Sequence, residues 1–529
     1  MLKGPDGQGS FFDTQYLCDQ LIPPDSFYRK FREVVAPLIK DEDFDAMYCR
    51  DNGRPPISPS LMALATILQF YRALSDREME TACMYDIQVK FALGLKLDER
   101  PFDHSSLGDF RDRLLKNGRE KEIFDRILDH LIKAGLIKKE EIQRIDATHI
   151  IADVAIPTIV VLIKKGIFNV LKALKRSHPA VWAKCAADIN IKDYTKETVN
   201  HEVAGRMEME KRKRRLVAVV AEARKVIENT SAIEDREIVR RVRVLKRILN
   251  DNTQEGPDGN PKERLYKEKR GDMLVSPIDE DARYGAKSAT KKFMGFKAQV
   301  AESVESRFIT NIKAMPGNRP DGETLVETVV EGQTRHGFCP PKVIGDTAYS
   351  DGEYRKLLNA KGIAMVAPLR DPNQRSKGIF PKSMFKYDEA SETLTCPQGV
   401  VTGVAYRDHA KNIRTFHFPM TKCKVCPVLA QCTRTKEGRR TVGIGPSNAE
   451  LRAAEVYNAT PQFKADMKLR PAIEGKLSEL KRYHGLTRAR FRGLVKLGLQ
   501  CYFAAAAVNI KRWIKLLARG SPAPCPAAA

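Results

Sequence analysis

Three short segments that lie far apart in the sequence place the strongest constraint on the fold. RIDATHI, with Asp146, and KVIGDTAYSDGEY, with Asp346, have the pattern of apolar strands that run through or end in an aspartate. RPAIEGKLSELK has the pattern of a helix with Glu474 one turn from its start. A carboxylate within a buried strand is costly unless it is paired or binds a metal ion. We therefore expect a fold that brings two strands and one helix together around these three carboxylates.

The residue types at these positions indicate a particular chemistry. Two carboxylates on strands and one on a helix can hold two divalent ions about 3.5–4 Å apart, which clamp the attacking and leaving oxygens of a phosphodiester. Mg²⁺ is a hard ion that prefers carboxylate oxygens to the donors of His and Cys. We therefore predict that Asp146, Asp346 and Glu474 are catalytic and bind two Mg²⁺ ions.

The charge balance indicates a polyanionic partner. The 529 residues include 91 Lys and Arg against 67 Asp and Glu, a formal net charge of +24. Nucleic acid suits so basic a chain best, although a merely basic soluble protein would have the same balance. The segment MLKGPDGQGSFFDTQ has no apolar core and no run approaches the roughly 18 apolar residues of a membrane span. With eleven cysteines, an odd number, this predicts reduced thiols and a cytoplasmic location.

Each of the three carboxylates has a rival nearby in the sequence. Asp153 lies seven residues after Asp146, but it falls where the strand should be ending. Glu479 lies five residues after Glu474 on the same helix, so the two side chains face different sides and cannot substitute for one another. We favour Asp146 for its place inside the apolar strand, and Glu474 for the cations that share its face.

The rival of Asp346 is Asp351. Ser350 and Glu353 form a capping-box pattern there, which predicts the start of a helix. An acidic residue in the first turn of a helix complements the helix dipole, which accounts for Asp351 without a metal. Asp346 could itself be a turn aspartate, which is common after strands. Its position at the end of an apolar strand makes it the better candidate.

Two cations accompany Glu474 on its helix. Arg470 precedes it by four residues and Lys481 follows it by seven, so all three share one face. We predict that Arg470 and Lys481 bind DNA backbone phosphates beside the metal ions. The alternative is a surface charge pair between Glu474 and Lys481, worth less than about 1 kcal/mol. Pro471 lacks a backbone N–H, so the helix should start near it, with Arg470 at the cap.

The periodicity of apolar residues changes several times along the chain. Helical spacing dominates the first 140 residues and returns, with far more charge, in residues 157–275, where DNTQEGPDGNPKE predicts a turn-rich loop. Residues 276–370 then give a hairpin of GFKAQVAES and RFITNIKAM, a helix, the strand KVIGD, a second helix and the strand IAMVAPL. This order predicts an α/β fold in which helices cover the faces of a mixed sheet.

These changes divide the chain into seven parts. We expect a helical DNA-binding domain (1–140), the first strand of a catalytic domain (141–156), a charged helical insertion (157–275), the catalytic core (276–370), a Cys-containing β insertion (371–445), C-terminal helices of the catalytic domain (446–518) and a disordered tail (519–529).

The N-terminal part is the candidate DNA reader. Ser58 is expected to cap one of its helices, and Ser75 with Glu78 forms a capping box that starts the next. Short helices joined by tight turns suit a helix-turn-helix-like domain, and an ordinary bundle with solvated charges is the alternative. The arginines that would face DNA are Arg72, Arg77, Arg111 and Arg113.

A cluster of four cysteines predicts a possible second metal site. Cys423 and Cys426 form a C-x2-C knuckle, and Cys396 and Cys432 would complete a tetrahedral Zn²⁺ site. The spacing is irregular, so His409 or His417 could replace a ligand, and unliganded cysteines or a lost site are the alternative. No catalytic step requires this cluster. The remaining candidates, His104 and His149, lack partners at metal or triad spacing and are expected to be structural.

The ordered carboxylates resemble those of the DDE transposases of bacterial insertion sequences. One large branch of that family has the signature Tyr-x2-Arg-x3-Glu-x6-Lys, and Arg470, Glu474 and Lys481 keep this spacing, whereas Met467 stands at the Tyr position. The segment from GRPPISPSLMALATILQFYRALSDREME to FDHSSLGDFR is similar to the N-terminal helical domain of that branch. HGLTRARFRGLVKLGLQCYFAAAAVNIKR is similar to its C-terminal basic helix, so the likeness spans most of the chain.

The resemblance implies both a fold and an activity. The fold would be ribonuclease H-like, and the activity would be cutting and rejoining double-stranded DNA at terminal inverted repeats by two-metal phosphoryl transfer. The implied partners are the terminal repeats, the target DNA and a second copy of the chain, in a homodimer on DNA within the bacterial nucleoid. The alternatives are a nuclease of the same fold without strand transfer and a catalytically inactive DNA-binding derivative.

Overall fold

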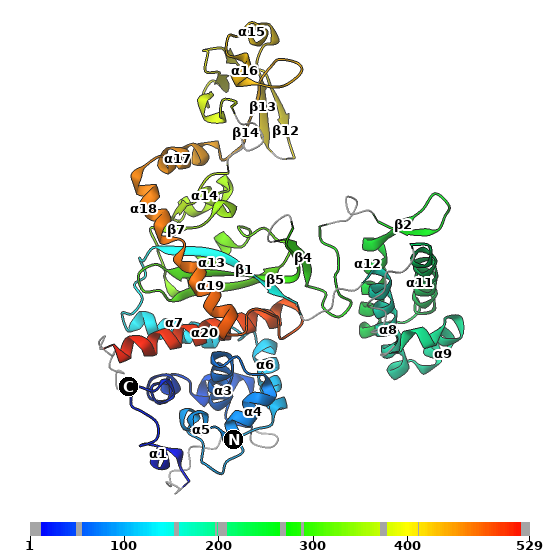
Figure 1. Cartoon of the computed structure of the whole chain (residues 1–529), viewed down its shortest axis with the longest axis vertical. Coiled ribbons are helices and arrows are strands. Elements are labelled where there is room, and N and C mark those ends of the chain that lie inside the picture. The colour runs from blue at the N-terminus through cyan, green and yellow to red at the C-terminus, as the bar shows by residue number, and fades with distance from the viewer. Residues whose placement is uncertain are drawn as a thin grey trace.

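The structure is a computed structural model that describes residues 12–48, 56–152, 158–195, 198, 209–264, 271–286, 290–370, 378–410 and 412–519. Figure 1 shows an N-terminal helical region below a central mixed sheet, with two further blocks that project away from the sheet. The architecture is therefore mixed α/β. None of the helices within these residues is long and apolar enough to cross a membrane.

Short helices build the N-terminal region. The Ser58 hydroxyl accepts the Leu61 N–H at 3.2 Å, and the capping box of Ser75 and Glu78 is formed in both directions, as predicted. The α-helices are α1 (Thr14–Leu17), α2 (Phe27–Lys30), α3 (Pro59–Tyr71), α4 (Asp76–Tyr85), α5 (Ile87–Leu93), α6 (His104–Lys116) and α7 (Glu122–Lys133).

The arginines of this region serve the fold more than the sequence suggests. Arg111 is buried, and its guanidinium donates to both carboxylate oxygens of Asp76, at 3.0 and 2.5 Å. Arg72 pairs with Asp86 at 2.5 Å, and Arg113 lies over the ring of Tyr48. A buried, paired guanidinium cannot reach a DNA groove, so the predicted DNA contact of Arg111 is wrong. Arg77 is exposed.

One mixed sheet forms the centre of the molecule. Its strand order is β4-β5-β1-β7-β8, and β6 pairs with β5 on the side away from β1. β1 runs antiparallel to β5 and parallel to β7, which is parallel to β8. The strands are β1 (Gln143–Ile151), β4 (Arg283–Ala286), β5 (Lys292–Ser303), β6 (Ile309–Pro316), β7 (Lys342–Ile344) and β8 (Ala364–Val366).

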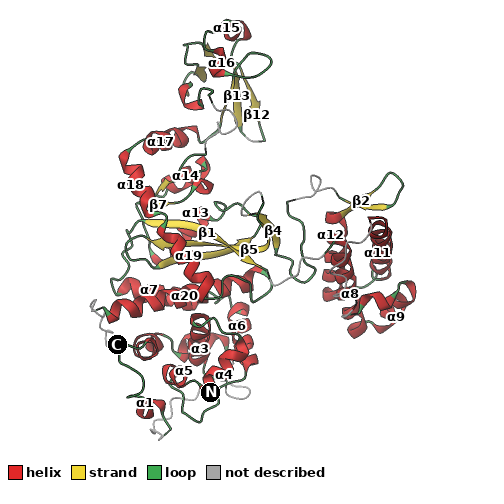
Figure 2. Ribbon diagram, in the orientation of Figure 1, coloured by secondary structure: helices red, strands yellow, loops and turns green. Residues whose placement is uncertain are grey.

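Helices cover both faces of this sheet (Figure 2). On one face, Ile145 and Ala301 pack with residues of α13 (Leu325–His336) and α14 (Gly352–Asn359). On the other face, Ile150 and Val300 belong to a large apolar core that also contains the N-terminal helices and α20 (Leu494–Ala518). The alternation of β1 side chains between the two faces follows from the period of a strand.

The C-terminal helix α20 has a different role from the one its basic residues suggest. Most of its residues from Leu497 to Ile514 are buried, and it contacts β6, α3 and α7. Two of its cations are held within the protein, since Lys511 pairs with Glu479 and Lys496 with Asp112. The likeness to a basic helix therefore does not make it a DNA-binding face; α20 is a core element.

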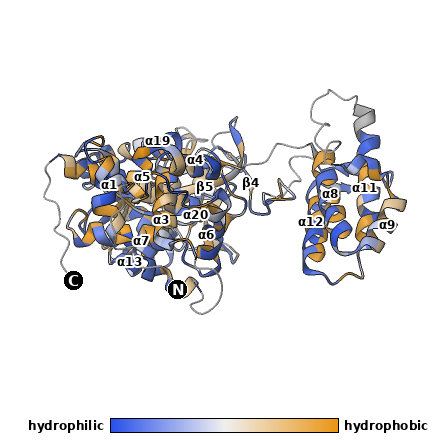
Figure 3. Ribbon diagram, turned by 90° about the horizontal axis from the view of Figure 1, so that it is seen from below, coloured by the Kyte–Doolittle hydropathy of each residue, from blue (hydrophilic) through white to orange (hydrophobic). Residues whose placement is uncertain are grey.

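The charged helical block has an apolar core of its own. Its helices are α8 (Ile159–Ser177), α9 (Pro179–Asp188), α11 (Met209–Asn229) and α12 (Arg236–Asn252). They stand apart from the sheet, and each carries both hydrophobic and hydrophilic residues (Figure 3). The predicted loop after α12 is instead a short hairpin, in which β2 (Thr253–Glu255) pairs with β3 (Pro261–Glu263). Gly259, at φ +72°, makes its tight turn possible.

The cysteine-containing module consists of two three-stranded sheets around a small core. The run VVTGVAY is divided between them, because β11 pairs with β10 whereas β12 pairs with β13. Its elements are β9 (Lys386–Asp388), β10 (Thr393–Thr395), β11 (Val401–Thr402), β12 (Ala405–Asp408), β13 (Ile413–His417), α15 (Met420–Lys424), α16 (Leu429–Cys432) and β14 (Thr441–Ile444).

Three helices return the chain from this module to the sheet. They are α17 (Asn448–Asn458), α18 (Pro461–Leu469) and α19 (Ala472–Tyr483). Pro461 is the first residue of α18, as predicted, but Pro471 is the N-cap of α19 and Arg470 is the C-cap of α18. Because proline has no N–H to continue the hydrogen-bond ladder, one helix ends and the next begins at this point.

Candidate active site

Asp146 lies in the middle of the central strand β1. Its Oδ1 accepts the Ala147 N–H at 2.8 Å, and its Oδ2 accepts from the Arg470 guanidinium at 3.0 Å. The side chain is only 13% exposed. Burial raises the pKa of Asp146 to about 6; the Ala147 N–H and Arg470 lower it, whereas the charges of Asp346 and Asp321 raise it. The strand therefore holds a carboxylate that strongly favours a cation.

Asp346 lies two residues after the end of β7, an inner strand of the same sheet. It is the N-cap of the short 3-10 turn Thr347–Tyr349, and its Oδ1 accepts the Ala348 N–H at 2.8 Å. Its Oδ2 lies 3.7 Å from the Arg470 guanidinium. The parallel pairing of β7 with β1 places this turn beside Asp146.

Glu474 lies in the first turn of α19 and is the most exposed of the three carboxylates, at 67%. Its Oε1 is 3.7 Å from the second terminal nitrogen of Arg470. One guanidinium group thus contacts all three predicted carboxylates. The Arg470 Nε is buried and has no hydrogen-bond partner. The geometry brings three acids from β1, the turn after β7 and α19 around one cationic group.

A buried ionic network holds the junction of α18 and α19 against the sheet. Arg144 and Glu302 face each other across β1 and β5 and form an ion pair of 2.7 Å. Arg144 also donates to the Leu469 carbonyl at 2.7 Å, just before Arg470. Arg307 pairs with Glu302 at 3.0 Å and donates to the Ala472 carbonyl at 3.2 Å. The network thus fixes the backbone on both sides of Arg470.

This network was not predicted, although the sequence contains a signal for it. Arg144 and Glu302 are charged residues inside strands that are otherwise apolar. Such residues are almost never fully buried unless they are paired. The sequence predicted both strands, but not the register that makes these two residues opposite neighbours.

Lys481 lies at the other end of α19, beside β1. Its Nζ is 3.3 Å from the Nε2 of His149, which is three residues after Asp146. His149 was expected to be structural because it lacks partners at metal or triad spacing in the sequence, and the neighbour it has here is a predicted DNA-binding lysine. The expectation that His104 lacks partners at metal spacing is wrong, because its Nδ1 lies 3.1 Å from Glu80 and 3.3 Å from Asp103 and the three could hold a metal ion. The sequence did not show this because Glu80 is far from His104 along the chain.

The structure gives other roles to two of the rival acids. Asp351 is the N-cap of α14 and accepts the Glu353 N–H at 2.9 Å, so the predicted cap at Ser350 is wrong by one residue. The Asp351 carboxylate accepts that bond as a charged group at the positive end of the helix dipole. Glu479 pairs with Lys511 at 2.8 Å. Asp153 lies outside the described residues.

The four cysteines of the β module face a common space. Cys396, Cys423, Cys426 and Cys432 line one cavity of about 30 Å³. The Val400 N–H donates to the Cys396 sulfur at 3.3 Å. None of the four forms a disulfide.

The donor types fit the metals predicted for them. The carboxylates suit a hard divalent ion, and the thiols suit Zn²⁺. Within the described part of the chain, however, a different set of possible ligands is close together. The donor atoms of Glu80, Asp103 and His104 all lie within 4.8 Å of one another. Neither the three carboxylates nor the cysteines are that close, so metal binding would draw either set together.

Two protein-family models match the chain. Residues 17–113, which span most of the N-terminal helices, match a transposase domain (DUF772). Residues 395–514 match a transposase DDE domain, and this match includes Cys396, Arg470, Glu474 and Lys481. No curated protein matches the chain.

Both ends of the chain therefore carry transposase domains, and the protein is a transposase of a mobile element. More narrowly, it is a DDE transposase of an insertion sequence, a class of protein that cleaves DNA. DNA is accordingly its partner, in agreement with the net charge of +24.

Proposed function

We propose that this transposase cuts and rejoins DNA at the terminal inverted repeats of its element by two-metal phosphoryl transfer. Asp146, Asp346 and Glu474 would be the Mg²⁺ ligands. The observation that supports this is the shared contact of all three carboxylates with the Arg470 guanidinium. Three acids that approach one cation can together neutralise a larger positive charge.

The sheet order supports a ribonuclease H-like fold for the catalytic part. On one side of β1, β5 pairs antiparallel with β1 and β6 pairs antiparallel with β5. On the other side, β7 runs parallel to β1 and β8 runs parallel to β7. We retain the predicted division into helical DNA-binding domain, catalytic core and two insertions as part of this proposal.

The roles of the residues follow from their chemistry. Bound Mg²⁺ would activate the attacking oxygen and stabilise the leaving one. Asp146 in β1 and Asp346 in the turn after β7 would fix the ion positions, and the exposed Glu474 of α19 would complete the set of ligands. Arg470 and Lys481 would hold backbone phosphates, because guanidinium and ammonium groups form strong charge-assisted hydrogen bonds with them. Catalysis would thus be chiefly positioning and charge neutralisation.

The proposal is tested with DNA that carries the ends flanking the protein's own coding sequence. With Mg²⁺, the wild type should give cleaved and strand-transfer products. Asp346→Asn should lower cleavage at least about a hundredfold and leave DNA binding intact, because it removes a metal ligand and little else. Asp351→Asn is the matched control and should behave as the wild type, since asparagine also caps helices well.

Each alternative predicts a different result in the same assay. Cleavage without joined products would favour a nuclease that lacks strand transfer. Binding without cleavage by the wild type would favour an inactive derivative. Undiminished cleavage by Asp346→Asn would overturn the assignment of the three carboxylates.

We also propose that Cys396, Cys423, Cys426 and Cys432 hold a structural Zn²⁺ ion. Their common cavity and the N–H donated to Cys396 support this assignment. Protein purified from zinc-supplemented cells should contain one Zn²⁺ per chain, and Cys423→Ser should lose it. Exposed Cys339 provides the matched control, because Cys339→Ser should retain the metal. Wild-type protein without zinc would show that the module is a plain β insertion.

On DNA, we propose that the N-terminal helices bind the element ends and that the charged helical block adds phosphate contacts. The side chains of Arg176, Arg224 and Arg243 in this block are all more than half exposed, which supports the second role. We further propose a homodimer on the DNA, in the nucleoid of a bacterial cytoplasm.

A further inference from the structure

A fourth carboxylate lies near the three predicted metal ligands. Asp321 belongs to the turn between β6 and α13, a segment that the signature of the family does not include. A Cβ atom on the next residue, Gly322, would lie only 2.9 Å from the Ala348 carbonyl oxygen. Pro320 and Ala348 also line the same cavity. The Asp321 turn therefore packs directly against the turn that Asp346 begins.

The position of Asp321 is fixed by β5. Its Oδ1 accepts from the Lys297 ammonium at 2.7 Å, and its backbone carbonyl accepts from the Gln299 amide at 2.8 Å. Lys297 also donates to the Arg319 carbonyl at 2.8 Å. In the sheet register, Lys297 is the direct neighbour of His149 on β1, the strand that carries Asp146.

The charge of Asp321 reaches the site. Burial is the largest cause of the raised pKa of Asp146, and the charges of Asp346 and Asp321 raise that pKa further. The Asp321 side chain is 32% exposed and that of Lys297 is 14% exposed. Water at the carboxylate can therefore link it to its surroundings, whereas the ammonium is largely enclosed.

We propose that Asp321 is a positioning residue of the metal site. Its carboxylate adds a fourth negative charge that attracts divalent ions through bridging water, and the positive charge of Lys297 partly offsets it. This inference rests on the proposed function, because it needs metal ions at Asp146, Asp346 and Glu474. Residues that support metal ligands in this way commonly contribute about 10-fold to 100-fold in metal affinity.

The Lys297–Asp321 pair allows a test that separates charge from structure. If the pair only holds a turn in place, Asp321→Asn and Lys297→Gln break the same contact and should change metal affinity in the same direction. If Asp321 acts on the ions, Asp321→Asn should weaken metal binding and Lys297→Gln should strengthen it, because it leaves the carboxylate unscreened.

The measurement is Mn²⁺ binding to the full-length protein, followed by the electron paramagnetic resonance of the free ion. We expect the dissociation constant to rise about tenfold in Asp321→Asn and to fall roughly threefold in Lys297→Gln. Lys297→Arg keeps the positive charge and should stay near the wild type. Asp351→Asn removes an equal charge from the exposed cap of α14 and should have little effect.

Changes in the same direction for Asp321→Asn and Lys297→Gln, or an Asp321→Asn value equal to that of Asp351→Asn, would overturn the inference. Circular dichroism of each variant identifies a failure to fold, and Asp321→Glu, which retains the charge, should then recover binding. Asp346→Asn distinguishes the two proposals. If it binds Mn²⁺ as the wild type does, the proposed function fails. If it loses binding while Asp321→Asn does not, only this inference fails.

Discussion

At the scale of residues, the candidate site depends on charges that are buried away from it. Glu302 is fully buried between Arg144 and Arg307, and both arginines hold carbonyl groups next to Arg470. Loss of one partner from a buried ion pair typically costs about 3–5 kcal/mol, because the remaining charge stays buried without compensation.

We therefore expect Glu302→Gln to lower the free energy of unfolding by about 3–5 kcal/mol, measured by urea denaturation at neutral pH. Glu392→Gln is the matched control. It removes one partner of the solvent-exposed pair with Arg414 and should cost far less, because solvent screens this pair. Equal effects of the two variants would show that the buried network contributes no more than a surface pair.

Each of the three predicted ligands stands in a strong local pattern of the sequence. Asp146 interrupts an apolar strand, Asp346 ends one, and Glu474 has cations at helical spacing. Asp321 had no such signal, since an aspartate in a turn before a helix is common. The pairing of Arg144 with Glu302 could not be predicted either, because it depends on strand register, and one residue of slip would separate them.

At the scale of elements, the sequence indicated the helices and strands of the central part well. Their pairing and their burial were harder to foresee. β4 was not predicted, and α20 was compared with a basic helix although it lies in the core. Its alanines, Ala504–Ala507, are fully buried, which lets neighbouring elements approach closely. The identity of those neighbours is a property of the tertiary structure.

The helices of the charged block offer a test of the proposed phosphate contacts. Replacing Arg176, Arg224 and Arg243 with glutamine should weaken binding to random duplex DNA. It should also reduce the slope of log affinity against log salt by roughly one for each phosphate that is no longer neutralised, because each neutralised phosphate releases counterions. Replacement by lysine keeps the charges and should preserve the slope. A glutamine variant with an unchanged slope would exclude these three arginines from DNA binding.

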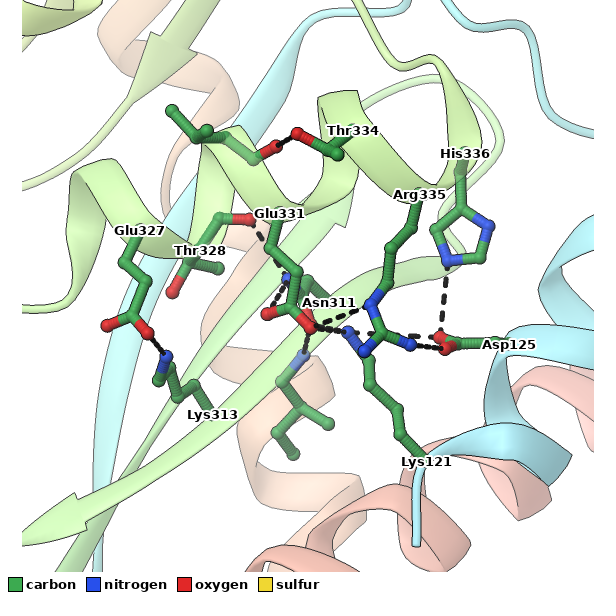
Figure 4. A network of polar contacts seen from close by, with 12 residues as sticks. Lys121, Asp125, Asn311, Lys313, Glu327, Thr328, Glu331, Thr334, Arg335 and His336 are labelled. Carbon is green, nitrogen blue, oxygen red and sulfur yellow. Dashed lines mark hydrogen bonds and ion pairs between the residues drawn. The ribbon is translucent and has the colours of Figure 1, made fainter. Parts of the chain in front are cut away.

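At the scale of the whole molecule, a polar network joins the N-terminal region to the sheet (Figure 4). Lys121, the N-cap of α7, contacts Asn311 of β6 at 3.0 Å and Glu331 of α13 at 2.7 Å. The nearly buried His336 of α13 lies between two carboxylates of α7, with Nδ1 2.7 Å from Asp129 and Nε2 3.2 Å from Asp125. Only the doubly protonated imidazole can donate to both.

This arrangement predicts a pH dependence of stability. Burial lowers the pKa of His336, but the hydrogen bonds and charges of Asp125 and Asp129 outweigh it and raise the pKa above 6.5. A raised pKa in the folded state gives stability that is complete below about pH 6.5 and is lost as the pH rises through the folded value. The melting temperature of the wild type should therefore exceed that of His336→Gln most at pH 6, and the difference should shrink towards pH 9.

His409, which is exposed in the β module, supplies the matched control for this prediction. His409→Gln should leave the melting temperature near that of the wild type across the same range. A His336→Gln difference that is constant with pH would mean that the imidazolium does not couple the two regions.

The burial of α20 also restricts how such a protein can diverge. The charged helical block and the cysteine module each have a separate core, so either could be shortened, lost or exchanged without exposing the rest. The N-terminal helices have no such independence, because they share one continuous core with α20 and the sheet. With the proposed role of these helices in binding the element ends, a lineage that acquired new ends would have to alter their surface residue by residue, since replacing them as a unit would uncover the apolar side of α20.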